Sequence, residues 1–289
     1  MPYRKTVYFS LLFLLIIGAI LAGIIFYARN QKLQVAFFDV GQGDAILISR
    51  DSQQILIDGG QSGQKLMEKL GEYVPFWDRE IEVIISTHPD ADHIGGLIDT
   101  LKNYTINQLI ESGAKNQSQV FGAYEKIIKE KEIEKQIASR GMKIKIFDGA
   151  ELEIFHPKIS MENISEKDTN EASVVAKLSF GENSFLFTGD LPANIENQLM
   201  NDNLPLSANV LKVSHHGSKS ATNTQFLDYI HPQEAIISVG KNNRYGHPAT
   251  ETLQRLQGEN IKILRTDESG DAVYNCENIN NKCKMETEF

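Results

Sequence analysis

The chain has 289 residues, of which 41 % are hydrophobic and 23 % are charged; these proportions are ordinary for a globular protein and exclude a disordered chain. The first 30 residues carry three basic residues and no acidic one, so the remainder holds 26 basic and 38 acidic residues, a net charge of −12. An acidic domain is not drawn to nucleic acid or anionic lipid at long range, which argues against a broad duplex-binding face. A phosphate-bearing substrate must therefore be attracted locally, for example by metal ions.

The first expected element is an apolar helix over residues 7–28, a segment without a charged residue. At about 1.5 Å per residue, these 22 residues form a helix about 33 Å long, enough to cross a hydrocarbon core of about 30 Å. A cleaved signal peptide is the main alternative, but its apolar core is shorter and ends in small residues, whereas this run ends in bulky ones. We therefore expect a single-pass membrane anchor, preceded by a basic segment over residues 1–6.

The orientation of this anchor is harder to predict, because two basic residues lie on each side of the apolar run. The only two cysteines, Cys276 and Cys283, are separated by six residues. Such a pair suits a disulfide-closed loop in an oxidising compartment, and two unrelated thiols in a reducing compartment are the alternative. We favour the disulfide and a domain outside the cytoplasm.

Strand and helix patterns alternate after the anchor. Apolar, β-branched runs predict strands near residues 35–40, 45–50, 55–60, 83–88, 143–147, 152–155, 174–180, 184–190, 210–216, 235–240 and 261–266. Helical patterns are predicted over residues 64–73, 95–103, 124–139, 193–200, 222–230 and 250–257, with the charge-dense part, 126–135, as a solvated face. Strand-rich halves with interspersed helices favour two sheets packed face to face, with helices on the outside.

Several of these strands end in residues with metal-binding side chains, and the densest cluster is His88-Pro-Asp90-Ala-Asp92-His93. Loops at strand ends converge on one edge of layered α/β proteins. Alternation places the first three of these side chains on one side of an extended turn, while His93 enters the next helix, so one turn can supply two ligands to each of two cations. Imidazole combined with carboxylate favours zinc, manganese or iron over calcium. A polar surface turn is the alternative, but three further strand ends carry His or Asp.

Asp190 follows a glycine at the end of an apolar strand, the position expected of a carboxylate that bridges two metal ions. His215 and His216 follow another strand. One of them would complete a metal site and the other would face the substrate, and the pattern leaves their order open. We interpret His156 and His231 as packed residues at the ends of structural elements.

Two further carboxylates, Asp44 and Asp58, lie in glycine-rich segments that follow strands. The first segment lacks the Gly-Lys-Ser/Thr of a nucleotide-binding loop, so we reject that function. Both carboxylates are candidates to accept hydrogen bonds from ligand imidazoles and fix their orientation, with ordinary turn residues as the alternative. The loop over residues 241–248 is rich in Asn and basic residues and contains His247, which favours a phosphate contact over a solvated turn.

Five ordered motifs, FFDVGQGDAILI, DGG, THPDADHIGG, LFTGD and LKVSHHGS, resemble those of the metallo-β-lactamase superfamily. They are most similar to the hydrolase domain that ends ComEC-type competence proteins, over about residues 33 to 270. The resemblance implies a four-layer αββα sandwich, which we place at residues 33–289. It also implies a set of metal ligands, within which Asp190 bridges: His88, Asp90, Asp92, His93, Asp190 and one histidine of the 215/216 pair, for which we take His216. Most of the superfamily has histidine where this chain has Asp90, and the competence branch and phosphorylcholine esterases of the same fold share the aspartate.

We predict a hydrolase that uses two divalent ions, zinc or manganese, to activate water and clamp the charge on a phosphoryl group. Asp92, His215 and His247 are assigned to catalysis, with either histidine contacting a non-bridging oxygen or protonating the leaving group.

The competence resemblance implies a phosphodiester substrate, single-stranded or end-threaded DNA. The alternatives are cell-envelope phosphoesters of the phosphorylcholine or teichoic-acid type, and a non-catalytic partner of a transport channel. ComEC-type proteins carry a multi-helix channel whereas this chain has one span, so we expect a separate DNA-uptake channel protein as partner.

Overall fold

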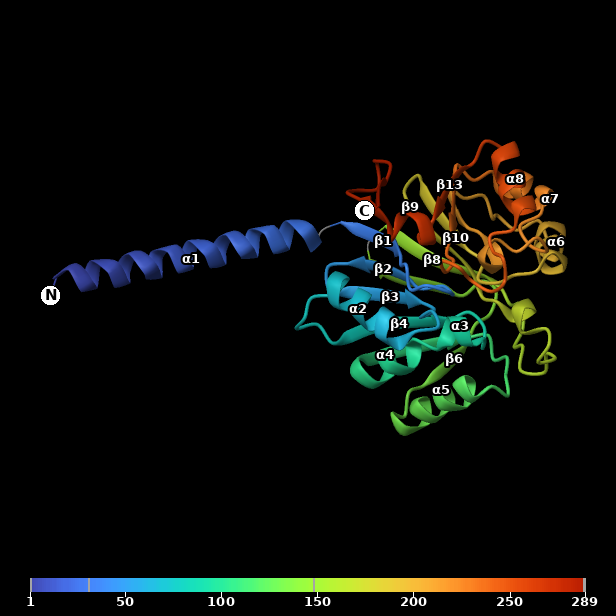
Figure 1. Ribbon diagram of the computed structural model, residues 1–289, viewed down its shortest axis with the longest axis horizontal. Helices are drawn as coiled ribbons and strands as arrows, with labels where there is room; N and C mark the ends of the chain where they lie inside the picture. The colour runs from blue at the N-terminus through green and yellow to red at the C-terminus, as the bar shows by residue number, and fades with distance from the viewer. Residues whose placement is uncertain (1, 31, 148, 288–289) are drawn as a thin grey trace.

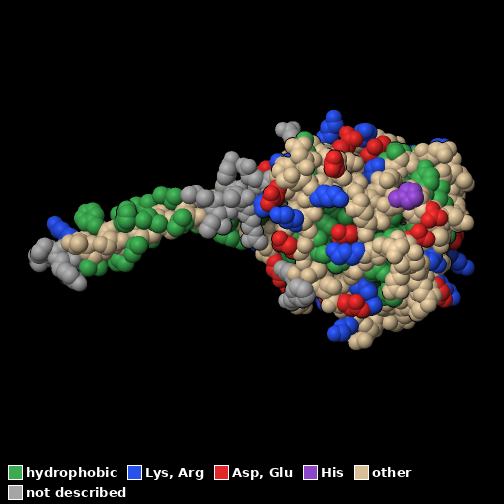
Figure 2. Space-filling view, turned by 90° about the horizontal axis from the view of Figure 1, so that it is seen from above, with side chains coloured by type: hydrophobic (Ala, Val, Ile, Leu, Met, Phe, Trp, Pro, Cys, Tyr) green, Lys and Arg blue, Asp and Glu red, His purple; other side chains and the backbone are tan. Residues whose placement is uncertain are grey.

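The computed structural model describes residues 2–30, 32–147 and 149–287. The helix α1 (Pro2–Asn30) projects from one end of the remaining domain (Figure 1). Its stretch Arg4–Gly23 has a mean hydropathy of 2.3, is not buried by the domain, and is long and apolar enough to cross a membrane. Figure 2 shows apolar side chains along this helix, whereas charged side chains of both signs are scattered over the visible face of the domain. Residue 1 and the side chains of residues 2 and 3 of the expected basic segment, and the side chains of residues 24–28 of the expected span, lie outside the described set.

Two sheets form the body of the domain, with strand orders β15-β14-β1-β2-β3-β4-β5-β6 and β13-β12-β11-β10-β9-β8-β7. The first sheet consists of β1 (Leu33–Phe37), β2 (Ile46–Arg50), β3 (Gln53–Ile57), β4 (Glu80–Ser86), β5 (Thr105–Glu111), β6 (Lys135–Ile137), β14 (Ala272–Cys276) and β15 (Lys284–Thr287). The second consists of β7 (Lys143–Phe147), β8 (Ala150–His156), β9 (Val175–Phe180), β10 (Asn183–Phe187), β11 (Val210–Lys212), β12 (Glu234–Ile237) and β13 (Lys262–Arg265).

Helices cover the outer face of each sheet, as Figure 1 shows. The first sheet carries α2 (Gly63–Tyr73), α3 (Ala91–Ile94), α4 (Leu97–Asn103) and α5 (Gln119–Glu130). The second carries α6 (Ala193–Asn201), α7 (Thr224–Ile230) and α8 (Thr250–Gly258). Three short elements complete the described chain: η1 (Thr169–Ala172), η2 (Ser214–Gly217) and α9 (Thr266–Ser269). The expected four-layer αββα sandwich is confirmed.

The core between the sheets explains why the strands are continuous apolar runs. In β1, Val35 and Phe37 belong to the central core, whereas Ala36 between them packs towards the helices of the first sheet. Because both faces of the strand are covered here, apolar residues follow one another from Val35 to Phe37 rather than alternating with polar ones.

The helix expected over residues 124–139 is partly wrong. The structure has α5, which ends at Glu130, followed by Glu132 with a positive φ of 53° and the edge strand β6. The backbone of β6 pairs with β5 on one side, while its side chains remain exposed. A polar, exposed edge strand lacks the apolar pattern that identifies buried strands, which is why the sequence favoured a longer helix. The strands β5, β14 and β15 were also missed.

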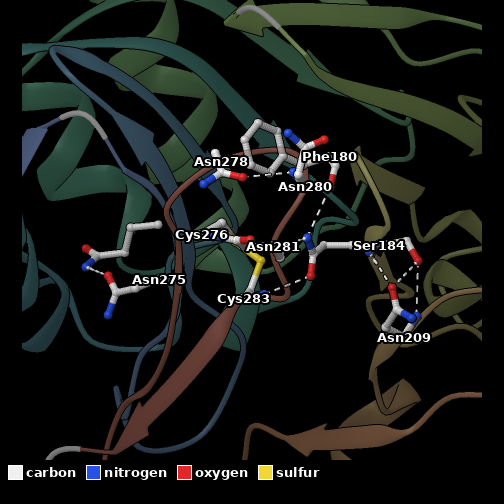
Figure 3. Close-up of a disulfide and its surroundings, with 11 residues drawn as sticks. Phe180, Ser184, Asn209, Asn275, Cys276, Asn278, Asn280, Asn281 and Cys283 are labelled. Atoms are coloured by element: carbon white, nitrogen blue, oxygen red, sulfur yellow. Dashed lines mark hydrogen bonds between the residues drawn. A yellow bond between two sulfur atoms is a disulfide. The ribbon is translucent and has the colours of Figure 1, made fainter.

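The two cysteines form a disulfide that closes a loop between β14 and β15 (Figure 3). Cys283 N donates to Asn183 Oδ1 at 2.8 Å, and Asn183 Nδ2 donates to Asn281 O at 2.8 Å. Asn183 begins β10 of the second sheet, so the closed loop links the two sheets. The disulfide expected from the sequence is confirmed.

One edge of the sandwich collects the carboxyl ends of many strands. In the first sheet, β1, β3 and β4 run in the same direction, because β2 is antiparallel to both of its neighbours and β3 is parallel to β4. In the second sheet, β10 to β13 are parallel. Val174 N donates to Thr87 O at 3.0 Å and joins the two sheets at this edge. The loops that follow these strands therefore meet here.

Candidate metal centre

The HPDADH segment follows β4 at this edge. Asp90 is the N-cap of α3, and Ile94 N donates to Asp90 O at 3.0 Å. Asp92 and His93 therefore lie within a short helix, and the extended turn expected from the sequence is wrong after Asp90. His88 and Asp90 precede this helix, whereas Asp92 and His93 belong to it, and the rings of His88 and His93 lie 4.1 Å apart.

Three imidazoles meet around one carboxylate. His88, His93 and His216 are buried, and their Nε2 atoms have no hydrogen-bond partner among the described residues. The distances from these Nε2 atoms to the carboxylate oxygens of Asp190 are 4.0, 3.3 and 3.4 Å. Buried nitrogen atoms without a partner are costly, and imidazole with carboxylate is a donor set that suits divalent metal ions. The residues at this edge therefore fit a metal centre.

Asp190 reaches this position from the loop after β10. Gly189 before it has a φ of +52°, and Asp190 N donates to Ser173 Oγ at 3.1 Å. Its Oδ1 is buried and has no hydrogen-bond partner in the described part of the chain, while its Oδ2 lies 3.7 Å from His215 Nε2. The structure thus places Asp190 between the imidazoles, and its role as a bridging ligand stays a prediction.

Asp58 orients two of the imidazoles from behind. Its Oδ2 lies 2.7 Å from His93 Nδ1 and accepts a hydrogen bond from Thr87 Oγ1 at 2.7 Å. Because the Thr87 hydroxyl uses its only hydrogen to donate a hydrogen bond to Asp58, its oxygen accepts a hydrogen bond from His88 Nδ1, 3.0 Å away. Both imidazoles consequently carry their proton on Nδ1 and leave Nε2 available to a metal ion.

Asp44 supports the third imidazole in a similar way. Its Oδ1 lies 3.3 Å from His216 Nδ1, which also contacts Ser238 O at 2.9 Å, so Nδ1 faces two acceptors. Lys212 Nζ lies 2.7 Å from the other oxygen of Asp44. The expectation that Asp44 and Asp58 fix ligand imidazoles is consistent with these contacts, since both lie on the Nδ1 side.

The other two carboxylates of the segment lie further out. Asp92 Oδ2 is 3.4 Å from His216 Nε2, and Asp92, His93 and His216 form a group whose ligand atoms all lie within 4.8 Å of one another. Asp90 Oδ2 lies 3.9 Å from His88 Nε2, while its Oδ1 accepts hydrogen bonds from Thr169 and from an asparagine after β5. The two sides of the segment therefore face different parts of the centre.

The glycine-rich segment after β1 packs directly against α3. Gly43 has a φ of +108°, and a Cβ atom there would collide with the carbonyl oxygen of Asp92. Gln42 Nε2 donates to Asp92 Oδ2 at 3.4 Å, and Gly240 N donates to Gln42 Oε1 at 3.4 Å. This segment is thus a support for the centre, in agreement with the rejection of a nucleotide-binding loop.

The electrostatic balance favours a bound cation. Burial alone would lower the pKa of His93, but Asp190 and Asp58 raise it well above its ordinary value. The pKa of His216 is likewise lowered by burial and raised, by a larger total, by its carboxylate neighbours. Burial would raise the pKa of Asp190, but His216 and His93 hold it well below its usual range. Carboxylates that stabilise positive charge on these rings would equally stabilise a metal ion in place of the protons.

His215 and His247 lie on the open side of the centre. His215 has a positive φ of 49°, and its side chain is 31 % exposed. Asn170 Nδ2 donates to His215 Nδ1 at 3.3 Å, so a neutral His215 carries its proton on Nε2. The ring of His247 lies 5.6 Å from that of His215, and Asn243 holds the His247 backbone through hydrogen bonds of 3.0 and 2.6 Å. Burial and the neighbouring histidines lower the pKa of His247.

The two histidines that the sequence excluded from the centre do lie outside it. His156 is buried, and its Nε2 lies 2.8 Å from Glu171 O, which agrees with a packed strand-end residue. His231 is instead an exposed residue with left-handed backbone that ends α7, so the packed role expected for it is wrong.

Sequence reasoning missed Lys212, Thr87 and Asn170. A signal existed for Lys212, because it interrupts the apolar run of a buried strand, and a buried lysine needs a charged partner. Thr87 and Asn170 act through contacts between segments that are distant in sequence, which a single sequence does not reveal.

A sandwich of two sheets with a His/Asp centre at the carboxyl ends of its strands defines a class of metal-binding proteins. The chain belongs to the metallo-beta-lactamase superfamily, whose family model matches residues 38–241. It is 34 % identical to "ComE operon protein 3" of Bacillus subtilis (strain 168) over 88 % of this chain and 34 % of that protein. It is 32 % identical to "Recombination protein 2" of Haemophilus influenzae over 84 % of this chain and 29 % of that protein. It is 28 % identical to "Competence protein ComA" of Neisseria gonorrhoeae over 87 % of this chain and 34 % of that protein.

The chain therefore resembles ComEC-type competence proteins and spans about a third of their length. Among solved structures, the metallo-beta-lactamase fold protein YhfI from Bacillus subtilis matches with a TM-score of 0.55 and 10 % identity, over 84 % of this chain and 99 % of that one. CmlA, a diiron beta-hydroxylase from Streptomyces venezuelae, matches with a TM-score of 0.50 and 12 % identity, over 82 % of this chain and 53 % of that one. These structures share the fold alone, which hosts more than one chemistry. The family and the competence relatives support a metal-dependent hydrolase.

Proposed function

We propose that the chain is a membrane-anchored phosphodiesterase that holds two divalent metal ions and acts on single-stranded or end-threaded DNA. The observation that carries the proposal is the position of Asp190 among three buried imidazoles whose Nε2 atoms lack hydrogen-bond partners within the described chain. A carboxylate with two oxygens can serve two ions, and the oxygens of Asp190 lie 3.3 to 4.0 Å from all three Nε2 atoms.

The segment after β4 divides between the two proposed ions. His88 and Asp90 would bind one ion, because Asp90 Oδ2 and His88 Nε2 are 3.9 Å apart. Asp92, His93 and His216 would bind the other, because their ligand atoms lie within 4.8 Å of one another. Zinc and manganese both accept such mixed nitrogen and oxygen ligands. Bound there, the ions would supply an activated water molecule and offset the charge on a phosphoryl group.

His215 is the proposed proton donor. Its Nε2 carries the proton of the neutral ring, lies 3.7 Å from Asp190 Oδ2, and belongs to a partly exposed side chain. A group in this position can donate a hydrogen bond to a non-bridging oxygen or a proton to the leaving oxygen. His247, beside it, has a lowered pKa, mainly because of burial, and is proposed to contact the substrate as a neutral ring.

The loop before His247 offers contacts suited to a nucleic acid strand. Arg244 Nη2 donates to Tyr245 OH at 2.9 Å, the Tyr245 side chain is exposed, and its ring is stacked with that of His247 at 6.0 Å. A guanidinium beside an exposed aromatic ring can bind a phosphate and stack on a base without requiring a basic protein surface. This supports a strand threaded to the centre rather than a duplex bound along a broad face.

The proposed location is a membrane, with the domain outside the cytoplasm. The apolar stretch of α1 supports the anchor, and the disulfide supports an oxidising compartment. One relative is named "Competence protein ComA", and a DNA-uptake channel protein is the partner that we propose on this likeness.

The proposal is tested with the purified full chain in detergent, loaded separately with zinc and manganese. We expect two metal equivalents per chain and cleavage of single-stranded DNA. We expect Asp92→Ala to lose one equivalent and nearly all hydrolysis, and Asp190→Asn to lose both ions. Asp228→Asn, at an exposed position on α7, is the matched control and should behave like the unchanged protein.

Three results would contradict parts of this proposal. A folded chain that binds no metal under any loading condition would leave only a non-catalytic partner of a channel. Cleavage of bis-p-nitrophenyl phosphate without DNA turnover would move the substrate to a smaller diester, such as one of the cell envelope. Full activity of Asp92→Ala with two metal equivalents would refute its assignment as a ligand.

A further inference from the structure

The loop between α2 and β4 presents two large aromatic side chains to solvent. Phe76 is 77 % exposed and Trp77 is 59 % exposed, and their rings lie edge to face with centroids 4.8 Å apart. Exposing adjacent aromatic surface to water is unfavourable, at about 25 cal/mol per Å² of apolar area. Such a pair is typical of a surface that contacts a partner.

The loop lies at the end of the sandwich from which α1 departs. The strands β1, β3 and β4 run in the same direction, so their first residues share one edge, and the candidate metal centre lies at the other. Gln54, at the start of β3, donates from Nε2 to Asp78 Oδ2 at 3.1 Å, which holds the loop at this edge. Figure 1 shows α1 joining the domain at the start of β1.

The connection between α1 and this edge is short. The helix ends at Asn30 and β1 begins at Leu33, so an extended chain of these few residues spans only about 10 Å. The strand β4 lies three places from β1 in the sheet, about 14 Å away at the usual strand spacing. A helix that crosses a bilayer would therefore keep the edge with the aromatic loop beside the lipid surface.

We propose that Phe76 and Trp77 insert into the headgroup region of the phospholipid bilayer that α1 crosses, giving the domain a second contact with the same membrane. This inference rests on the membrane anchoring in the proposed function. Tryptophan side chains are in general enriched at this depth, because the indole ring combines a large apolar surface with one polar N–H group. Asp78 and Arg79 follow with opposite charges, so the contact does not depend on anionic lipid.

Two contacts with one surface fix the orientation of the domain. The strand β4 has seven residues and is about 23 Å long, and His88 follows its far end. The candidate metal centre would then face away from the bilayer, at least a strand length above it. A nucleic acid strand could reach it there without crossing the headgroup layer.

The test uses the intrinsic fluorescence of Trp77, which is the only tryptophan of the chain. The full chain is reconstituted into phosphatidylcholine vesicles with and without brominated acyl chains. The matched control is the double variant Trp77→Phe/Ile159→Trp, which moves the only tryptophan to a side chain that is 72 % exposed in the native protein. Ile159 lies at the opposite edge, because Met161 nearby donates from its backbone N to Ser112 O after β5.

We expect the brominated lipid to quench Trp77 strongly and its emission to shift to shorter wavelength on reconstitution, while the emission of the control is unchanged. Protein that floats with the vesicles but shows no quenching of Trp77 would overturn the second contact and leave the anchor intact. Equal quenching of the control would overturn the proposed orientation. Protein that does not float with the vesicles at all would refute the anchor, and with it the inference that depends on it.

Discussion

Lys212 Nζ lies 2.7 Å from Asp44 Oδ2, and both side chains are almost completely buried. The second oxygen of Asp44 lies 3.3 Å from His216 Nδ1. Lys212, Asp44 and His216 therefore form a buried series of polar contacts from the end of β11 to the candidate metal centre. Burial would raise the pKa of Asp44, but Lys212 and His216 lower it below its ordinary value. The lysine thus keeps a buried carboxylate ionised behind a proposed ligand.

Lys212→Met should therefore destabilise the protein and weaken metal binding. Removing one partner of a buried ion pair leaves the other charge uncompensated, which costs about 3–5 kcal/mol. Urea unfolding and a metal titration measure the two effects. The exposed Lys219→Met is the matched control, and adding Asp44→Asn to Lys212→Met should restore part of the lost stability. An unchanged urea midpoint for Lys212→Met would contradict the prediction.

Asp58→Ala should lower the affinity for both proposed ions, because Asp58 orients His93 directly and His88 through Thr87. Loss of such an orienting carboxylate typically lowers metal affinity by about 10- to 100-fold. Isothermal titration with zinc measures this change, with the exposed Asp228→Ala as control. The number of ions bound at saturation should remain the same, and wild-type affinity in Asp58→Ala would show that the two imidazoles do not need this support.

The disulfide should stabilise the domain measurably, because it closes the loop that links the two sheets. For a loop of this length, the effect on the free energy of unfolding is about 2–3 kcal/mol. The double variant Cys276→Ser/Cys283→Ser should unfold at a correspondingly lower urea concentration. Treating the unchanged protein with a reductant should reproduce this loss but have no effect on the variant. Equal stability of all three samples would contradict a structural role for the bond.

The fold and the position of the centre could be predicted because their signals are local. The apolar runs that end at Thr87 and Thr188 identify buried strands, and the His and Asp residues directly after them have no role in a core. Residues that follow the strands of a layered α/β fold lie at one edge of the sheets. The sequence alone therefore predicted that Asp190, His216 and the HPDADH segment lie close together. The ordered motifs identified the family from the same residues.

The missed features depend on contacts between distant segments or on exposed backbone. The edge strand β6 has three exposed side chains, so its sequence pattern does not distinguish it from the end of a charged helix. Both histidines of the 215/216 pair have a left-handed backbone, with φ angles of 49° and 52°, and the structure buries the ring of His216 while the side chain of His215 is 31 % exposed. A sequence motif of two adjacent histidines contains no information about that choice.

A buried carboxyl outside the centre predicts how stability changes with pH. Glu196 of α6 accepts hydrogen bonds from Thr222 N at 2.5 Å and from Asn223 N and Nδ2 at 3.2 and 3.0 Å. Burial raises the pKa of Glu196 to about 7, although these donors oppose the shift. The folded protein then holds a proton near neutral pH that the unfolded chain releases at its ordinary pKa of 4.5.

The free energy of unfolding should consequently fall as the pH rises from about 4.5 to about 7, since the unfolded state binds fewer protons in that range, and should level off above it. Between pH 5 and pH 8, this group alone should remove about 2.5 kcal/mol, at about 1.4 kcal/mol per pKa unit. Glu196→Gln is neutral at every pH and lacks this contribution. Urea unfolding of both proteins at pH 5 and pH 8 measures this contribution. The free energy of unfolding of the unchanged protein, relative to that of Glu196→Gln, should be greater at pH 5 than at pH 8. A difference that is the same at both pH values would mean that the three N–H donors keep Glu196 ionised throughout, and that hydrogen bonding outweighs burial at this site.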